Sequence, residues 1–124
     1  MKFCTDIKQS NELLEIGLSL ETADMYWELD KNCSIEAYNL VPLIRYSTKE
    51  RKELFEKDKE LIPCWSLAAL LSVLPEPELI QNQEGTWLLR IWDSKRFPWS
   101  VGGYINPVDA CYEMIVKLKY ENLL

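Results

Sequence analysis

The chain of 124 residues contains no histidine, so it lacks the commonest base in nucleophilic catalysis. Ser–His and Cys–His arrangements are therefore excluded, because no imidazole accepts the proton of the nucleophile. Carboxylates remain as the groups that would carry acid–base chemistry. We single out Asp24, because it lies between the apolar residues Ala23 and Met25. A structural hydrogen bond explains this aspartate better than catalysis does, and a helix-capping charge explains Asp109 fully.

The four cysteines, Cys4, Cys33, Cys64 and Cys111, are spread along the chain without a Cys-x-x-Cys spacing. This is not the pattern of zinc ligands, and we expect no metal and no cofactor. Cys64 stands beside Trp65 at the start of a predicted helix, where an exposed thiol would have a lowered pKa. A buried, reduced thiol is the favoured alternative.

The best candidate for a binding surface is the aromatic and basic stretch over residues 87–104. Its candidate binding residues are Arg90, Trp92, Lys95, Arg96 and Trp99. Tryptophan and arginine side chains anchor protein partners, and they also stack on nucleic-acid bases. On a strand, Arg90 and Trp92 share one face, and Leu89 and Ile91 share the other. Either the first set is exposed together with Arg96 and Trp99, or helices cover both faces, which is the arrangement that we favour.

The net charge of the chain is -6, and neither half of the sequence is basic. The electrostatic signature of a typical duplex-DNA or RNA binder is therefore missing. The N-terminus lacks the apolar run of a signal peptide, and no stretch reaches the ~18 apolar residues of a membrane span. We expect a cytoplasmic protein with one domain over residues 1–124.

Local signals predict the elements of the N-terminal half. Residues 5–17 begin with polar capping residues and end at Gly17, which predicts a helix. Alternating apolar and polar residues over 23–29 predict a half-buried strand, and residues 35–46 predict a second strand. A Ser-x-x-Glu capping box opens the segment 47–60, which predicts a helix with a solvated, charged face.

The C-terminal half predicts two further helices and three short strands. Ser66 caps a helix that is apolar on nearly every side and lies within residues 64–74. Residues 79–92 predict a hairpin, and a third strand over 97–101 precedes a bend or bulge at two glycines. An Asn-Pro start predicts a last helix over 107–120. The expected fold is α+β: a small antiparallel sheet packed against the central apolar helix and the C-terminal helix, with an N-terminal helix.

Three segments carry a resemblance to a known family. They are ETADM at 21–25, IPCWSLAALL at 62–71 and NPVDACYEMI at 106–115. Together they resemble a family of small, uncharacterised proteins encoded by gut bacteria of the Bacteroides group, their phages and mobile elements. The resemblance spans the whole chain and implies a cytoplasmic accessory protein of phage or mobile-element type. It implies no activity and no catalytic residue.

These observations favour a non-enzymatic protein-interaction module whose partner is another protein or a second copy of the chain. The alternative is a nucleic-acid-associated accessory factor that uses the same cluster of Arg90, Trp92, Lys95, Arg96 and Trp99. A third and less favoured interpretation is a small enzyme that acts through carboxylates, with Asp24 as its named residue.

Overall fold

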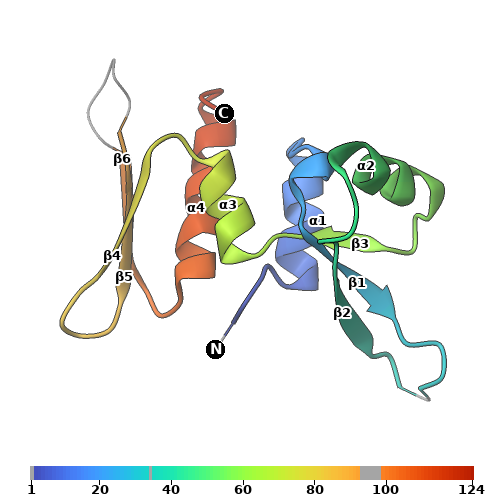
Figure 1. Ribbon diagram of the computed structural model, residues 1–124. Coiled ribbons are helices and arrows are strands. Elements are labelled where there is room, and N and C mark those ends of the chain that lie inside the picture. The colour runs from blue at the N-terminus through green and yellow to red at the C-terminus, as the bar shows by residue number, and fades with distance from the viewer. Residues whose placement is uncertain (1, 34, 93–98) are drawn as a thin grey trace.

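The computed structural model describes residues 2–33, 35–92 and 99–124, which form two small antiparallel sheets and four α-helices (Figure 1). In chain order the elements are α1 (Ile7–Glu15), the 3-10 turn η1 (Leu20–Thr22), β1 (Met25–Leu29), β2 (Tyr38–Pro42), α2 (Thr48–Lys57), β3 (Ile62–Cys64), α3 (Leu67–Val73), β4 (Pro77–Gln81), β5 (Trp87–Ile91), β6 (Trp99–Tyr104) and α4 (Pro107–Tyr120). This order confirms the α+β class and the predicted N- and C-terminal helices. Within these ranges, no helix has the length and apolar character needed to cross a membrane.

The strands divide into two three-stranded sheets, so the expectation of a single sheet is wrong. The first sheet has the order β2-β1-β3, and the second has the order β4-β5-β6. The segment Ile62–Cys64 is too short to show a period of two in the sequence, yet it pairs with β1 as β3. Because this strand occupies residue 64, the central helix begins only at Leu67, after its Ser66 cap.

Each α-helix begins at a polar side chain that accepts a backbone hydrogen bond. Asp6 and Ser47 form capping boxes at α1 and α2, while Ser66 caps α3. Asn106 caps α4, and Pro107 takes the first helical position. A cap of this kind satisfies an N–H group that the first turn leaves free, and it stabilises the fold by about 1 kcal/mol. All four helix starts are therefore fixed by local sequence.

Strand β6 differs from the strand predicted over residues 97–101. It continues through Gly102 and Gly103, and a register shift against β5 gives a local bulge beside them. Gly103 has a φ of +82°, in the left-handed region that favours glycine. The start of the predicted strand, residues 97 and 98, lies outside the described residues.

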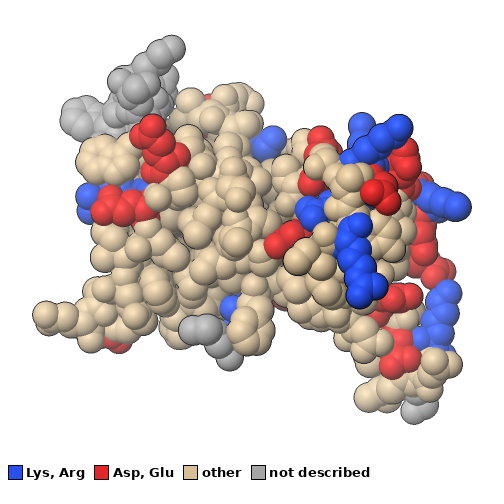
Figure 2. Space-filling model, in the orientation of Figure 1, with Lys and Arg blue, Asp and Glu red and all other residues tan. Residues whose placement is uncertain are grey.

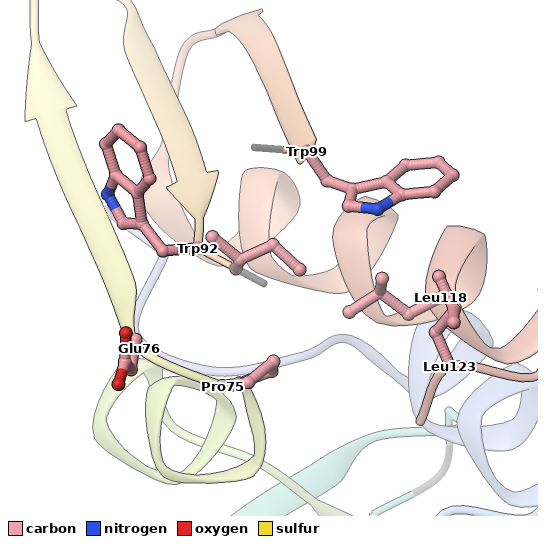
Figure 3. A pocket seen from close by; sticks show the side chains of 7 residues that line it. Pro75, Glu76, Trp92, Trp99, Leu118 and Leu123 are labelled. Carbon is pink, nitrogen blue, oxygen red and sulfur yellow. The ribbon is translucent and has the colours of Figure 1, made fainter. Parts of the chain in front are cut away.

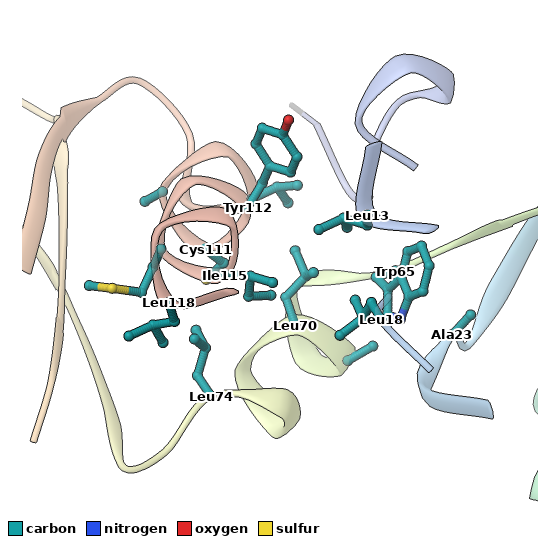
Figure 4. Close-up of a cluster of buried hydrophobic side chains, with 14 of the residues drawn as sticks. Leu13, Leu18, Ala23, Trp65, Leu70, Leu74, Cys111, Tyr112, Ile115 and Leu118 are labelled. Carbon is teal, nitrogen blue, oxygen red and sulfur yellow. The ribbon is translucent and has the colours of Figure 1, made fainter. Parts of the chain in front are cut away.

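One buried cluster joins the two halves of the molecule (Figure 4). Leu70 of α3 and Ile115 of α4 are fully buried in it, and Leu13 and Trp65 enter it from the N-terminal half. Burying an aliphatic side chain of this size stabilises the fold by roughly 1.5–3 kcal/mol. The core therefore depends on contacts between residues that are distant in the sequence.

Helix α4 covers one face of the second sheet. It contacts β5 and β6, and its residues Val108, Ile115 and Leu118 are fully buried. Figure 1 shows α3 and α4 on the same side of this sheet, with no described helix on the opposite side. The sequence predicted that helices cover both faces of this sheet. In the part of the chain that the structure describes, helices cover one face, so that prediction is wrong there.

A polar network ties the N-terminus to the start of α4. The Lys2 ammonium lies 2.8 Å from Asp109 Oδ1 and 3.1 Å from Asp6 Oδ2. Gln9 Nε2 donates to Asp109 Oδ1, and Asn106 Nδ2 donates to Asp109 Oδ2, each at 2.8 Å. Burial alone would raise the pKa of Asp109, but these hydrogen bonds and the nearby ammonium outweigh it. The pKa of Asp109 therefore lies below its usual value of 3.8.

The substitution Asp109→Asn tests this network through its pH dependence. A carboxylate whose pKa is lowered by folding stabilises the protein above its unfolded pKa and loses that contribution as pH falls through the folded value. At pH 7 we expect the variant to lose about 1 kcal/mol of unfolding free energy in urea. The deficit should be constant down to about pH 5 and should shrink below pH 3.8. The exposed-site variant Glu84→Gln serves as the control. A stability deficit of Asp109→Asn that stays the same below pH 3.8, or an equal deficit in Glu84→Gln, would contradict this explanation.

Candidate interaction surface

Asp24 lies where β1 meets the start of α3. Its Oδ1 accepts the backbone N–H of Ser66 at 2.9 Å, and its Oδ2 accepts the Ser66 hydroxyl. The oxygen of that hydroxyl in turn accepts the backbone N–H of Ala69 and caps α3. Both carboxylate oxygens are thus engaged in holding the helix start, which confirms the structural interpretation of Asp24.

The same junction continues through Trp65. Its indole Nε1 donates to Thr22 Oγ1 at 2.9 Å, and its backbone N–H donates to Thr5 Oγ1 at 3.1 Å. The backbone N–H of Thr5 returns a hydrogen bond to the Trp65 carbonyl at 2.9 Å. Among the described residues, every buried side-chain nitrogen and oxygen has a hydrogen-bond partner. The polar side-chain atoms buried at the junction are therefore all satisfied within the protein.

Cys4, Cys64 and Cys111 are buried, whereas Cys33 is exposed. Cys64 is fully buried in β3, which confirms the packed thiol expected from sequence. The neighbouring Cys4 thiol and burial raise the pKa of Cys64, and the Cys64 thiol lowers the pKa of Cys4. Burial raises the pKa of Cys111 to about 12. Among the described side chains, no group of three or more Cys, Asp and Glu is placed to hold a metal ion.

The side of the second sheet that faces away from α4 is the candidate interaction surface, which we call the outer face. Strand register places two rows of side chains on it. Its residues are Glu78, Ile80, Leu88, Arg90, Ser100 and Gly102, with Trp92 following directly after β5. Ile80 is 36% exposed and Trp92 is 47% exposed. This face thus combines large apolar side chains with a solvent-facing position.

Arg90 and Trp92 form one polar-aromatic unit with Glu78. The Arg90 guanidinium lies 5.6 Å from the centre of the Trp92 ring and 3.9 Å from Glu78 Oε2. The Trp92 indole N–H donates to the same Glu78 oxygen at 3.3 Å. The carboxylate therefore balances the positive charge of Arg90 and orients the indole beside it. Cation–π contacts at exposed sites contribute about 0.5–1 kcal/mol.

Trp99 does not join Trp92 on the outer face. It pairs with Ile91 in the register of β5 and β6, so its side chain belongs to the face that packs on α4. The Lys117 ammonium of α4 lies 4.9 Å from the centre of the Trp99 ring. Figure 3 shows the two indoles on opposite sides of one hollow, with Trp99 over α4. The structure therefore separates the two tryptophans that the sequence hypothesis placed together.

That hollow has a volume of about 320 Å³ and is mostly apolar (Figure 3). Its lining residues are Pro75, Glu76, Ile91, Trp92, Trp99, Leu118 and Leu123. Glu76 has a φ of +41°, an unfavourable conformation for a residue that carries a side chain. The hollow lies next to Trp92, at the edge of the second sheet.

The structure brings together only part of the set predicted from sequence. Arg90 and Trp92 are in contact, whereas Lys95 and Arg96 lie outside the described residues. Sequence reasoning missed Glu78 and Ile80, which pair directly with Arg90 and Leu88. The hairpin was predicted, so its register would have identified both residues as neighbours on the same face.

Comparisons with known proteins do not assign the chain to a group: no family model matches it, and no similar curated protein or solved structure is found.

The structural role of Asp24 is tested by Asp24→Asn. The amide has one acceptor oxygen where the carboxylate has two, so one hydrogen bond to Ser66 is lost. We expect a loss of about 1–3 kcal/mol of unfolding free energy in urea denaturation, without loss of the native circular dichroism spectrum. Combined with Ser66→Ala, the two losses should be less than additive, because both remove the same contact. Glu28→Gln, at an exposed position of β1, serves as the control and should change stability by less than about 0.5 kcal/mol. An Asp24→Asn variant as stable as this control would refute the structural role.

Thiol labelling tests the burial of the cysteines. We expect maleimide to modify Cys33 at the rate of a free thiol, because this side chain is exposed. Cys111 should react only when the protein unfolds, since it is fully buried and burial raises its pKa to about 12. Peptide mass spectrometry at successive times measures both rates. Equal labelling of the two cysteines in native buffer would show that α4 is not packed as described.

Proposed function

We propose that this protein is a non-enzymatic interaction module that binds another protein, or a second copy of itself, through the outer face. The observation that carries the proposal is the exposed Trp92, supported by Arg90, on a sheet face that no described helix covers. Tryptophan and arginine are the residues most enriched among those that dominate binding energy at protein interfaces. The resemblance noted in the sequence adds the proposed context, a cytoplasmic accessory protein of phage or mobile-element type.

The shape of this region supports a protein partner. A three-stranded face gives contact area, and a hollow of about 320 Å³ beside Trp92 offers room for an apolar side chain. Interfaces of this kind have an apolar centre and a polar rim. Here Ile80 and Leu88 supply the apolar part, while Glu78 and Arg90 supply the polar part.

Charge distribution supports the same surface. Figure 2 shows most of the charged side chains of that view over α2 and the β1–β2 hairpin, while at the edge of the β4–β6 sheet acidic and basic side chains lie together. With a net charge of -6, the protein repels other acidic surfaces except where its own charge is balanced. Glu78 and Arg90 balance each other on the outer face, so a contact there has a low electrostatic penalty.

A nucleic-acid-associated accessory factor is the second candidate. Arg90 beside the exposed Trp92 ring resembles a base-stacking platform, and this is the observation in its favour. The carboxylate of Glu78 lies in the same unit and would repel phosphate groups. We therefore rank protein binding above nucleic-acid binding.

Affinity capture from a lysate of the organism that encodes the protein tests the proposal. The bait is the tagged chain, mixed with untagged chain so that a second copy is also detected. We compare the wild type with the double variant Ile80→Ser/Trp92→Ser, and with Ile44→Ser as a control, since Ile44 is 85% exposed and lies outside the outer face. Removing an interface tryptophan commonly costs about 2 kcal/mol or more, so partner recovery should fall at least ~10-fold in the double variant alone.

Salt separates the two candidates. A protein recovered at moderate salt by the wild type and the control, and lost from the double variant, supports the interaction module. Nucleic acid that leaves the bait as salt rises supports the second candidate. Equal recovery by all three baits would show that the outer face is not the binding surface.

A further inference from the structure

Cys4 and Cys64 are neighbours in space although they lie far apart in the sequence. Cys4 is paired with Ser66 in an isolated antiparallel bridge, and Cys64 lies two residues before Ser66 in the same extended segment. Side chains alternate along extended chains, so Cys4, Ser66 and Cys64 point to the same face. This register makes Cys4 and Cys64 diagonal neighbours in an antiparallel pair, and the two thiols are close enough that each shifts the pKa of the other.

The two thiols differ in their access to solvent. Cys4 lines a surface hollow of about 430 Å³, although only 5% of the residue is exposed. Trp27 and Leu40, which face each other across β1 and β2, line the same hollow. Cys64 is completely buried. A small molecule in the hollow would therefore meet Cys4 first, with Cys64 next to it and protected from solvent.

Electrostatics favour Cys4 as the reactive member of the pair. The neighbouring Cys64 thiol lowers the pKa of Cys4, and the positive charge of Lys2 acts in the same direction, against burial and the nearby carboxylates. Lys2 also lines the hollow. A thiolate is the nucleophilic form of cysteine, so Cys4 is the better nucleophile towards an oxidant.

We propose that Cys4 and Cys64 form a peroxide-sensitive dithiol site that closes reversibly to a disulfide. The Cys4 thiolate attacks hydrogen peroxide, so that an S–O bond forms, the O–O bond breaks and hydroxide leaves as water after protonation. Cys64 then attacks the sulfenic sulfur of Cys4. The S–S bond forms, the S–O bond breaks, and the departing hydroxide takes the proton of the Cys64 thiol. The two thiols are oxidised by two electrons, and the peroxide is reduced to two molecules of water.

The other two cysteines provide internal controls. Cys33 is exposed, so it measures the reaction of an accessible thiol outside the pair. Cys111 is fully buried in α4, where burial raises its pKa to about 12 and keeps the thiol protonated. If accessibility alone governed oxidation, Cys33 would react first.

Peptide mapping of the whole protein tests the proposal. The reduced protein is treated with a small excess of hydrogen peroxide, alkylated in denaturant and digested with trypsin without reduction. Cleavage after lysine and arginine places the four cysteines in four different peptides, 3–8, 32–45, 60–90 and 97–117. We expect peptide 3–8 to be linked to peptide 60–90, and the thiols that react in denaturant to fall from four to two. Dithiothreitol should restore all four.

Two variants extend the test. Cys33→Ser should form the same linkage, whereas Cys64→Ser should leave Cys4 as a sulfenic acid that dimedone traps. An alkyl label on both peptides 3–8 and 60–90 would mean that Cys4 and Cys64 stayed reduced. That result, together with oxidation of Cys33, would overturn the proposal. The wild-type peptide map distinguishes these outcomes by itself, even if Cys64→Ser does not fold.

Discussion

The hydrogen-bonded junction at Trp65 and Ser66 is the constraint on which the rest of the structure depends. At this point the chain leaves β3 and enters α3, passing from one half of the molecule to the other. Thr5 and Thr22 hold Trp65, and Asp24 holds Ser66. The first sheet and the central helix are thereby fixed relative to each other. A buried donor or acceptor left without its partner costs about 1–3 kcal/mol, so an error at any of these contacts would weaken both halves together.

This constraint also separates the structural and the binding parts of the molecule. The aspartate that looked most suited to chemistry holds the start of α3, and both of its carboxylate oxygens contact Ser66. Among the described helices, α4 packs on one side of the second sheet, and the outer face of that sheet lies away from the junction. Substitutions at Ile80 or Trp92 should therefore alter binding without disturbing the core, because both side chains are partly in solvent. A fold in which helices covered both faces would not permit this separation.

Much of the fold could be predicted because the signals are local. The caps at Asp6, Ser47, Ser66 and Asn106 each depend on residues within one turn, and all four proved correct. The division into two sheets could not be predicted, because β3 has three residues and its partner β1 is distant in sequence. For the same reason the partner of Asp24 was not identified. At the candidate surface, Arg90 and Trp92 were predicted from alternation along one strand. The position of Trp99 depends on the register between β5 and β6, which alternation along one strand does not specify.

Hydrogen–deuterium exchange shows directly whether binding occurs on the outer face. Exchange is measured by mass spectrometry for the free protein and for the same protein bound to its captured partner. The account predicts that bound partner slows exchange in segments 78–80, 88–92 and 100–102, because these contain the outer-face residues. Exchange in α2 should not change. Protection confined to α2 or to the β1–β2 hairpin, with the outer-face segments unchanged, would contradict the account.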